Sequence, residues 1–227
     1  MKRLVFAVAL SFVAGQALAA DLPMPGPAPA YIPPVARAYS WTGFYLGING
    51  GGAFGSSKWS DPVLGSTGNF GAAGALVGGT VGANYQMGQF VIGIEGDGDW
   101  SSLSGSTHVT CGFTPCETRS DWLATVRGRA GYAVDRVLFY GTGGAAFANV
   151  QAGLSGGPFT NSTQTGWTAG AGIEYAFAPN WTAKVEYLFA DLPNLSCGAV
   201  NCGGTATSVS LNENIIRGGV NFKFGGW

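Results

Sequence analysis

Apolar and polar residues alternate with a period of two along most of the chain from Trp41 onward. In residues 181–189 every odd position is apolar, and Thr182, Lys184 and Glu186 stand between them. Successive side chains of a strand point to opposite faces, so this pattern predicts strands with one apolar and one polar face. No stretch beyond Trp41 keeps the spacing of an amphipathic helix.

Eight such segments predict an all-β fold, an eight-stranded antiparallel up-and-down transmembrane β-barrel over residues 40–227. Short turns join the second segment to the third, the fourth to the fifth and the sixth to the seventh, whereas the other connections are long. Short turns at one end and long loops at the other are typical of outer-membrane barrels. A secreted sandwich or a soluble lipid-binding barrel is the alternative. The predicted strands are roughly 42–54, 73–85, 89–101, 119–132, 136–149, 164–177, 181–191 and 208–224, and the predicted exposed loops are 55–72, 102–118, 150–163 and 192–207.

The N-terminal residues indicate export. Lys2 and Arg3 precede an apolar stretch, and Ala17-Leu18-Ala19 is a small-x-small cleavage site, so residues 1–19 are predicted to be a signal peptide. The apolar stretch is too short for the ~20 residues of a membrane helix. Residues 20–39 hold six prolines and are predicted to be an extended periplasmic linker.

The composition fits a protein in lipid. Only 10% of the residues are charged and 39 are glycine, while the formal net charge of −1 gives no reason to expect a nucleic-acid partner. In a membrane barrel the apolar face of each strand meets lipid and the polar face lines the lumen. The sheet must close, because lipid cannot satisfy the hydrogen bonds of an open edge.

Alternation places charges of both signs in the lumen, nearly in balance. Eight strands leave an interior that side chains just fill, and buried charges need partners. A salt-bridged plug is therefore predicted, with a gated ion pathway as the alternative. A calcium loop at residues 95–99 is disfavoured, because further ligands are missing and the run is within a strand. The predicted lumen charges are Glu95, Asp97, Asp99, Asp121, Arg127, Arg129, Glu174, Lys184, Glu186, Arg217 and Lys223.

Tryptophans are expected at both edges of the apolar band, as in the aromatic girdles of membrane barrels. Trp41 and Trp181 lie at the short-turn end of their predicted strands, and Trp100, Trp122 and Trp167 lie at the long-loop end.

The four cysteines form two matched pairs in two predicted loops. Cys111 and Cys116 enclose four residues, as do Cys197 and Cys202. In an exported protein this even count predicts disulfides, with local pairing favoured over bridges between the loops. A four-thiolate zinc site is the alternative, and no cofactor is expected.

His108 is the single histidine, and Ser104, Ser106 and Asp121 are near it in sequence. This arrangement is a weak basis for a surface hydrolase, and a solvated loop histidine is the simpler interpretation. No Gly-x-Ser-x-Gly or His-Glu-x-x-His motif is present, so no catalytic residue is predicted.

The start of the predicted barrel resembles that of a known family. Ala20-Asp21-Leu22-Pro23 and the run YSWTGFYLGINGGG at 39–52 resemble small alphaproteobacterial outer-membrane proteins, called outer-membrane immunogenic or porin-family proteins and distantly similar to the OmpA membrane domain. The resemblance implies an eight-stranded barrel with a periplasmic N-terminus and no catalytic residues. It also implies a terminal aromatic that the outer-membrane assembly machinery recognises. Phe222 and Phe224 alternate as required, but the chain continues to Trp227, so either Phe224 or Trp227 is the terminal aromatic.

These observations predict a Gram-negative outer-membrane protein with a structural and surface-interaction role. Its expected partners are outer-membrane lipid, lipopolysaccharide and the assembly machinery, and its external surface partner cannot be named. A small-solute channel is the alternative function, and a surface hydrolase resting on His108 is the third.

Overall fold

The computed structural model describes residues 39–61, 65–108, 115–157, 159–197 and 207–225. The predicted signal peptide and residues 20–38 of the predicted linker lie outside these ranges. Within the ranges, no helix is long and apolar enough to cross a membrane.

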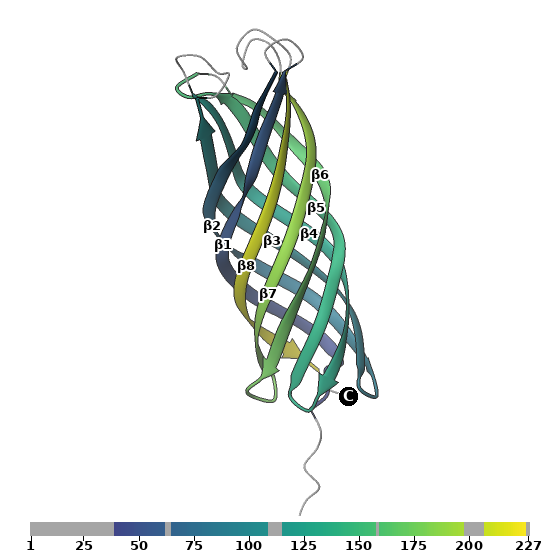
Figure 1. Ribbon diagram of the computed structural model, residues 1–227. Coiled ribbons are helices and arrows are strands. Elements are labelled where there is room, and N and C mark those ends of the chain that lie inside the picture. Colours follow the sequence, from purple (N-terminus) through teal and green to yellow (C-terminus); the bar gives the residue numbers. More distant parts are fainter. Residues whose placement is uncertain (1–38, 62–64, 109–114, 158, 198–206, 226–227) are drawn as a thin grey trace, which may run out of the picture. The chain divides into compact units, whose positions relative to one another are not determined.

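Eight antiparallel strands close into a barrel (Figure 1). Each strand pairs with the next along the chain, and β1 pairs with β8 from Phe44↔Phe224 to Ser60↔Ser208. The predicted fold class is therefore confirmed, and the sandwich alternative is wrong. The strands are β1 (Gly43–Asp61), β2 (Gly65–Met87), β3 (Phe90–Thr107), β4 (Cys116–Val134), β5 (Val137–Leu154), β6 (Phe159–Ala176), β7 (Trp181–Cys197) and β8 (Thr207–Phe224).

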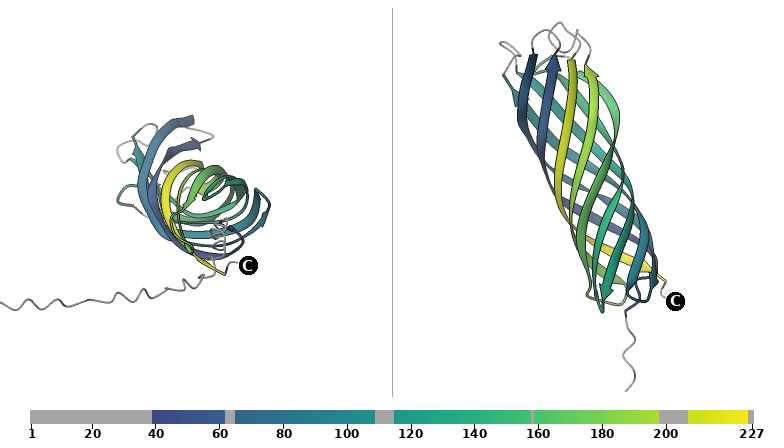
Figure 2. Two further views of the ribbon diagram at one scale, coloured as in Figure 1. Left: turned by 90° about the horizontal axis from the view of Figure 1, so that it is seen from below. Right: turned by 45° about the vertical axis from the view of Figure 1, so that its right-hand side comes forward.

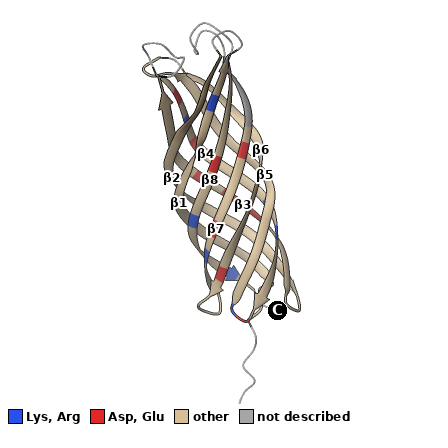
Figure 3. Ribbon diagram, in the orientation of Figure 1, with Lys and Arg blue, Asp and Glu red and all other residues tan. Residues whose placement is uncertain are grey.

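Apolar side chains cover the outside of the barrel, the reverse of a soluble protein. Large apolar residues are exposed on every strand; Phe44 on β1, Ile94 on β3 and Val185 on β7 are examples. Charged positions are few along the strands (Figure 3), and the two further views of the ribbon show the same closed ring of tilted strands (Figure 2). A closed sheet with an apolar outer wall satisfies its backbone hydrogen bonds without water, as a bilayer requires.

The strands are longer than a membrane crossing needs. They run from 17 residues in β7 to 23 in β2, whereas about 9–11 tilted residues cross the hydrocarbon. Most of the predicted loops 55–72, 102–118 and 150–163 is therefore strand, and in the predicted loop 192–207 the described residues 192–197 and 207 are strand as well. The strands leave residues 62–64, 108–115, 155–158 and 198–206 between them. Backbone pairing does not depend on apolar side chains, so hydroxyl-rich and amide-rich segments continue the sheet where the outward face meets water.

We call these strand ends beyond the apolar band the polar extension. On β3 its exposed residues are Ser102, Ser104 and Ser106, just past Trp100. On β6 they include Asn161 and Thr163, just before Trp167. The outer wall thus changes from apolar to polar at the aromatic residues.

A bulge in β4 changes which residues face the lumen. The register shifts between Ser120 and Leu123 against β5, and between Trp100 and Leu103 against β3. Odd positions of β4 from Leu123 onward are buried, whereas before the bulge the even positions are buried. The extra residue in a bulge reverses the phase of the alternation.

Neighbouring glycines of β5 have different surroundings on the two faces of the wall. A Cβ at the inward Gly144 would lie 2.1 Å from the Val126 carbonyl oxygen, whereas one at the outward Gly143 meets only the Thr168 oxygen at 3.5 Å. Inward glycines of this kind allow the wall of a narrow barrel to close tightly.

We therefore expect Gly144→Ala to destabilise the barrel by about 1–3 kcal/mol, the usual cost of overpacking. Gly143→Ala is the matched control and should be neutral or slightly stabilising, because alanine has less conformational freedom to lose than glycine. Urea unfolding in lipid vesicles measures both. Equal effects of the two substitutions would contradict this account of the glycines.

Candidate functional site: the barrel lumen

The side chains that fill the lumen change in kind along the barrel axis. The inward residues from Trp41 through β1 show this order. Trp41 lies in an apolar group, Tyr45 lies in a charged network, and Ala53 and Trp59 lie in a second apolar group. All four are at most 3% exposed. The lumen is thus a filled interior in three zones.

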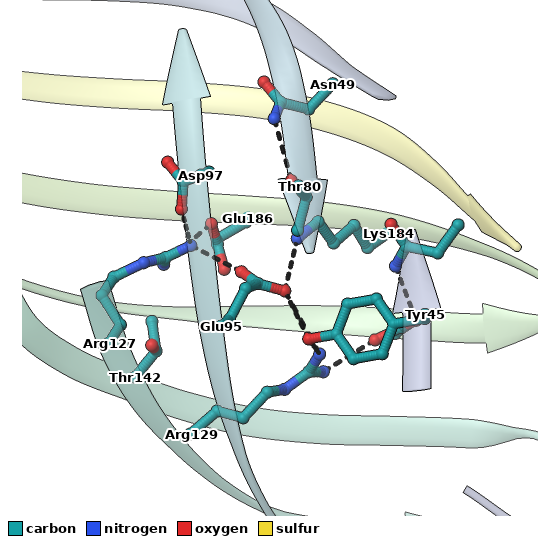
Figure 4. Close-up of polar contacts among 12 residues, drawn as sticks. Tyr45, Asn49, Thr80, Glu95, Asp97, Arg127, Arg129, Thr142, Lys184 and Glu186 are labelled. Carbon is teal, nitrogen blue, oxygen red and sulfur yellow. Dashed lines mark hydrogen bonds and ion pairs between the residues drawn. The ribbon is translucent and has the colours of Figure 1, made fainter. Parts of the chain in front are cut away.

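Glu95 on β3 lies at the centre of the charged zone (Figure 4). Its Oε1 lies 2.5 Å from Nη2 of Arg127, and its Oε2 accepts hydrogen bonds from Lys184 Nζ at 2.8 Å and the Tyr45 hydroxyl at 2.7 Å. Arg129 is 3.5 Å from the same Oε2. Residues of β1, β4 and β7 therefore meet on the Glu95 carboxylate of β3, which ties together parts of the wall that are not neighbours.

Arg217 on β8 binds three further carboxylates. Its Nη1 lies 2.8 Å from Asp97 and 2.7 Å from Asp99, and its Nη2 lies 2.9 Å from Glu186. Arg127 also contacts Asp97 and Glu186. The guanidinium offers five donors in a planar fork, which suits it to several acceptors at once.

Arg129 extends the network toward the short-turn end. It bonds Glu174 at 2.7 Å, and the same carboxylate accepts hydrogen bonds from Thr182 at 2.5 Å and Asn221 at 3.0 Å. The Arg129 guanidinium also stacks 4.0 Å from the ring centroid of Tyr140. Four cations and five carboxylates are joined in this way, which is the condition under which buried charges are tolerated.

An apolar layer lies on each side of the network. Toward the polar extension, leucines such as Leu76, Leu123 and Leu188 pack with alanines of β5 and with Ile215. Toward the short turns, Trp41 packs with Val91, Leu138 and Tyr140 among others. The charged zone is therefore enclosed by hydrocarbon at both ends.

Trp41 blocks the short-turn end of the lumen and is not part of the membrane girdle. It is 2% exposed, its ring meets Tyr39 edge-to-face at 4.9 Å, and its backbone N–H donates to Gln86 Oε1. The girdle prediction for Trp41 is wrong because Trp41 shares the odd phase of the inward Tyr45, whereas the outward Phe44 is even. The other predicted girdle tryptophans are exposed or half-buried: Trp100, Trp122, Trp167 and Trp181.

Ten of the eleven predicted lumen charges are buried, and Asp121 is the exception. Asp121 lies within the β4 bulge, directly after the buried Ser120, and points outward, where it accepts a hydrogen bond from Gln151. Its placement in the lumen was wrong for that reason. Lys223 is buried but stands apart from the network, because it donates to the Ser40 carbonyl and lies over the Tyr39 ring.

The charge pattern missed three buried residues that matter. Tyr45 and Tyr140 supply hydroxyl groups to Glu95 and Glu186, and Glu213 is buried at 2% exposure within the apolar layer. Glu213 has the same odd phase as Arg217 and was detectable on that ground. The tyrosines carry the same phase signal, since Tyr45 alternates with the outward Phe44, but residue type alone predicts that an aromatic residue in a membrane strand faces lipid.

Glu213 offers a test of how the lumen tolerates charge. Its Oε1 has no hydrogen-bond partner among the described residues, and its neighbours on the same face of β8 are Leu211 and Ile215. An unsatisfied buried polar group costs about 1–3 kcal/mol. We therefore expect Glu213→Leu to stabilise the barrel against urea by about that amount.

The matched control is Glu186→Leu, which should destabilise the barrel instead, because it removes a partner of Arg127 and Arg217. A loss of stability in Glu213→Leu equal to that in Glu186→Leu would contradict this account of the apolar layer.

The residues considered for other chemistry form no assembled site in the described part of the chain. Glu95, Asp97 and Asp99 are paired with cations, and no described group of acidic, histidine and cysteine residues is suited to hold a metal. His108 follows β3 and is exposed, while Asp121 is bonded to Gln151.

The cysteine and assembly-signal predictions fall partly outside the described residues. Cys111, Cys202 and Trp227 lie outside them, Cys116 is buried at the start of β4, and Cys197 ends β7. The disulfide pairing stays a prediction. Phe224 ends β8. The ring of Phe222 packs between those of Phe224 and Trp181, with centroid distances of 4.9 Å to Phe224 and 5.0 Å to Trp181.

Comparisons with known proteins agree with this geometry. A family model for the outer membrane protein beta-barrel domain matches residues 5–224. The 31 kDa outer-membrane immunogenic protein of Brucella melitensis is 36% identical, with 99% of this chain and 100% of that protein covered. The 22 kDa outer membrane protein of Rhizobium leguminosarum bv. viciae is 32% identical, over 84% of this chain and 82% of that protein.

Among solved structures, the outer membrane protein OprG from Pseudomonas aeruginosa has a similar fold. The TM-score is 0.51 at 13% identity, and the match covers 82% of this chain and 99% of that chain. The apolar outer wall, the closed eight-stranded ring and the matched family agree. The chain belongs to the outer membrane protein beta-barrel family and is a protein of the outer membrane.

Proposed function

We propose that this protein is a closed structural barrel that contributes to envelope integrity and presents its polar extension and loops to the outside. The observation that carries the proposal is the filled lumen. Glu95 alone binds cations from two strands, and apolar layers enclose the charged zone on both sides. A barrel built in this way transmits no solute and holds a rigid wall in the bilayer.

The polar extension supports a role at the cell surface. Its outward serines, threonines and asparagines follow directly on the aromatic row that includes Trp100 and Trp167. Hydroxyl and amide groups at that height suit the sugars and phosphates of lipopolysaccharide, which we propose as the partner around the barrel. The relatives named outer-membrane immunogenic proteins are consistent with surface exposure, and the external partner of this chain stays unassigned.

Export and assembly complete the proposal. Residues 1–19 would direct export, Phe224 would end the strand that the assembly machinery binds, and Cys111–Cys116 and Cys197–Cys202 would form local disulfides. Mass spectrometry of the unreduced protein from outer membranes tests two of these points. We expect a mature N-terminus at Ala20 and two loop-internal cross-links, and a Cys111–Cys202 link would contradict the pairing.

The proposed function is tested in cells that lack the protein. We expect such cells to be more sensitive to detergents and large antibiotics, with unchanged uptake of small nutrients, since a closed barrel contributes to the barrier and not to transport. A copy of the wild-type chain should restore resistance. Unchanged detergent sensitivity together with slower nutrient uptake would support a small-solute channel and contradict the proposal.

A further inference from the structure

A shallow apolar groove crosses the lipid-facing side of β3 to β7, near the short turns. Its volume is about 830 Å³, within the range of roughly 300–1,000 Å³ typical of ligand pockets. The walls are large side chains, including Phe90 on β3 and Tyr187 on β7, both exposed. Such a hollow on the outer wall of a membrane barrel is filled by hydrocarbon or by another protein.

The strand register explains the hollow. One row across the sheet reads Ile92↔Ala130↔Gly141↔Ala171↔Tyr187. The three central strands contribute only Ala, Gly and Ala to this row, while β3 and β7 contribute large side chains. The floor is therefore one row of small residues between raised sides.

The next row toward the short turns closes the groove at one end. It reads Phe90↔Tyr132↔Phe139↔Ile173↔Val185, in which every residue is large. Phe90 and Tyr132 also pack edge-to-face with centroids 5.5 Å apart. The groove thus has a defined end on the side of the short turns.

Opposite charges lie beyond that end. The turn between β4 and β5 consists of Asp135 and Arg136, both exposed. Tyr132 and Phe139 each stand two residues from their strand's end at this turn, which is about 7 Å of strand. A phosphate is complementary to Arg136, and an ammonium group is complementary to Asp135.

We propose that the groove binds the acyl chain of a zwitterionic phospholipid of the phosphoethanolamine type, with the lipid headgroup at Asp135 and Arg136. An acyl chain is apolar and narrow, which suits a hollow with a small-residue floor between large apolar side chains. A second copy of the barrel fits less well, because a two-fold interface would place one concave surface against an identical one and leave a void. The charged turn beside the groove is matched by a headgroup that carries both charges.

Filling the groove tests the proposal. A Cβ at Gly141 would meet only the Gly170 carbonyl oxygen at 3.9 Å, so Gly141→Leu occupies the hollow without a backbone clash. The matched control is Gly52→Leu on β1, across the barrel ring from β5, where the nearest atom is also a carbonyl oxygen at 3.9 Å. Heat-modifiable mobility in detergent gels checks that both variants are folded, and Ala171→Leu serves as a second filling variant.

Native mass spectrometry of delipidated, refolded protein titrated with phosphatidylethanolamine gives the readout. We expect the wild type and Gly52→Leu to retain one lipid. Both filling variants should retain at least roughly tenfold less lipid, since a single methylene in an apolar pocket already changes binding by about that factor. Equal retention by all variants would overturn the proposal. A dimer that cross-links in the wild type and is lost in Gly141→Leu, with lipid retention unchanged, would assign the groove to a second copy and also overturn it.

The headgroup part is tested separately with diacylglycerol of the same chains. Arg136→Gln is expected to weaken retention of phosphatidylethanolamine but not of diacylglycerol, whereas Lys58→Gln, at an exposed site in the polar extension, should change neither. Undiminished phosphatidylethanolamine retention in Arg136→Gln would contradict the assignment of the headgroup to this turn.

Discussion

Replacing Arg217 with methionine should destabilise the folded barrel by about 3–5 kcal/mol, the cost of removing one partner from a buried ion pair. Arg217 is 1% exposed, and among the described residues it is the cation that forms a salt bridge with Asp99. Without it, Asp99 has no counter-charge, and Asp97 and Glu186 depend on Arg127 alone. Urea unfolding in lipid vesicles, followed by tryptophan fluorescence, measures the change.

Arg119→Met is the matched control. Arg119 forms a single ion pair with Glu117, also at 2.7 Å, but its side chain is 48% exposed in the polar extension. Its removal should change stability little, because water screens such pairs. Arg217→Lys should fall between, since lysine keeps the charge but loses the planar fork that reaches several carboxylates. Equal effects of Arg217→Met and Arg119→Met would show that the network does not stabilise the barrel.

Trp41→Ala is expected to have the second largest effect, a loss of about 3–5 kcal/mol, as for other buried tryptophans. The indole closes the lumen at the short-turn end and packs against Tyr39, Leu138 and Tyr140. Because it precedes β1, its loss should also free the short segment that begins at Tyr39. Limited proteolysis between residues 39 and 43 of the folded protein, together with urea unfolding, tests both effects.

Trp181→Ala provides the comparison, because Trp181 is 44% exposed to the outside of the same end of the barrel. It should lose less stability than Trp41→Ala and remain resistant to cleavage in residues 39–43. The reverse order of the two losses would return Trp41 to the membrane girdle and contradict its role in the lumen.

The eight strands and their closure could be predicted because period-two alternation is a local property. Each strand shows it without reference to its neighbours, and a membrane barrel reverses only which face is buried. The same logic placed Glu95, Arg127 and Arg217 in the lumen. Their individual partners could not be predicted, since Arg217 meets Asp97 and Asp99 across the lumen through strand tilt and register that no local pattern encodes.

The errors have local causes. Alternation in phase with Arg127 and Arg129 predicts Asp121 in the lumen, but a single extra residue in β4 reverses the phase, and a bulge shows in register and not in composition. Residue type predicts Trp41 in the membrane girdle, whereas its odd phase, shared with Tyr45, indicates the lumen. The composition of the polar extension predicts loops, because Ser, Thr and Asn favour turns, although the same residues pair readily when a neighbouring strand continues.

The most direct test of the filled lumen is single-channel conductance of the refolded protein in a planar lipid bilayer. Side chains of the charged zone and of the two apolar layers occupy the described lumen, so the account predicts no stable openings in the wild-type protein. Stable openings whose conductance changes when Arg127 or Glu95 is replaced with alanine would show that ions pass through the network, and would contradict the account.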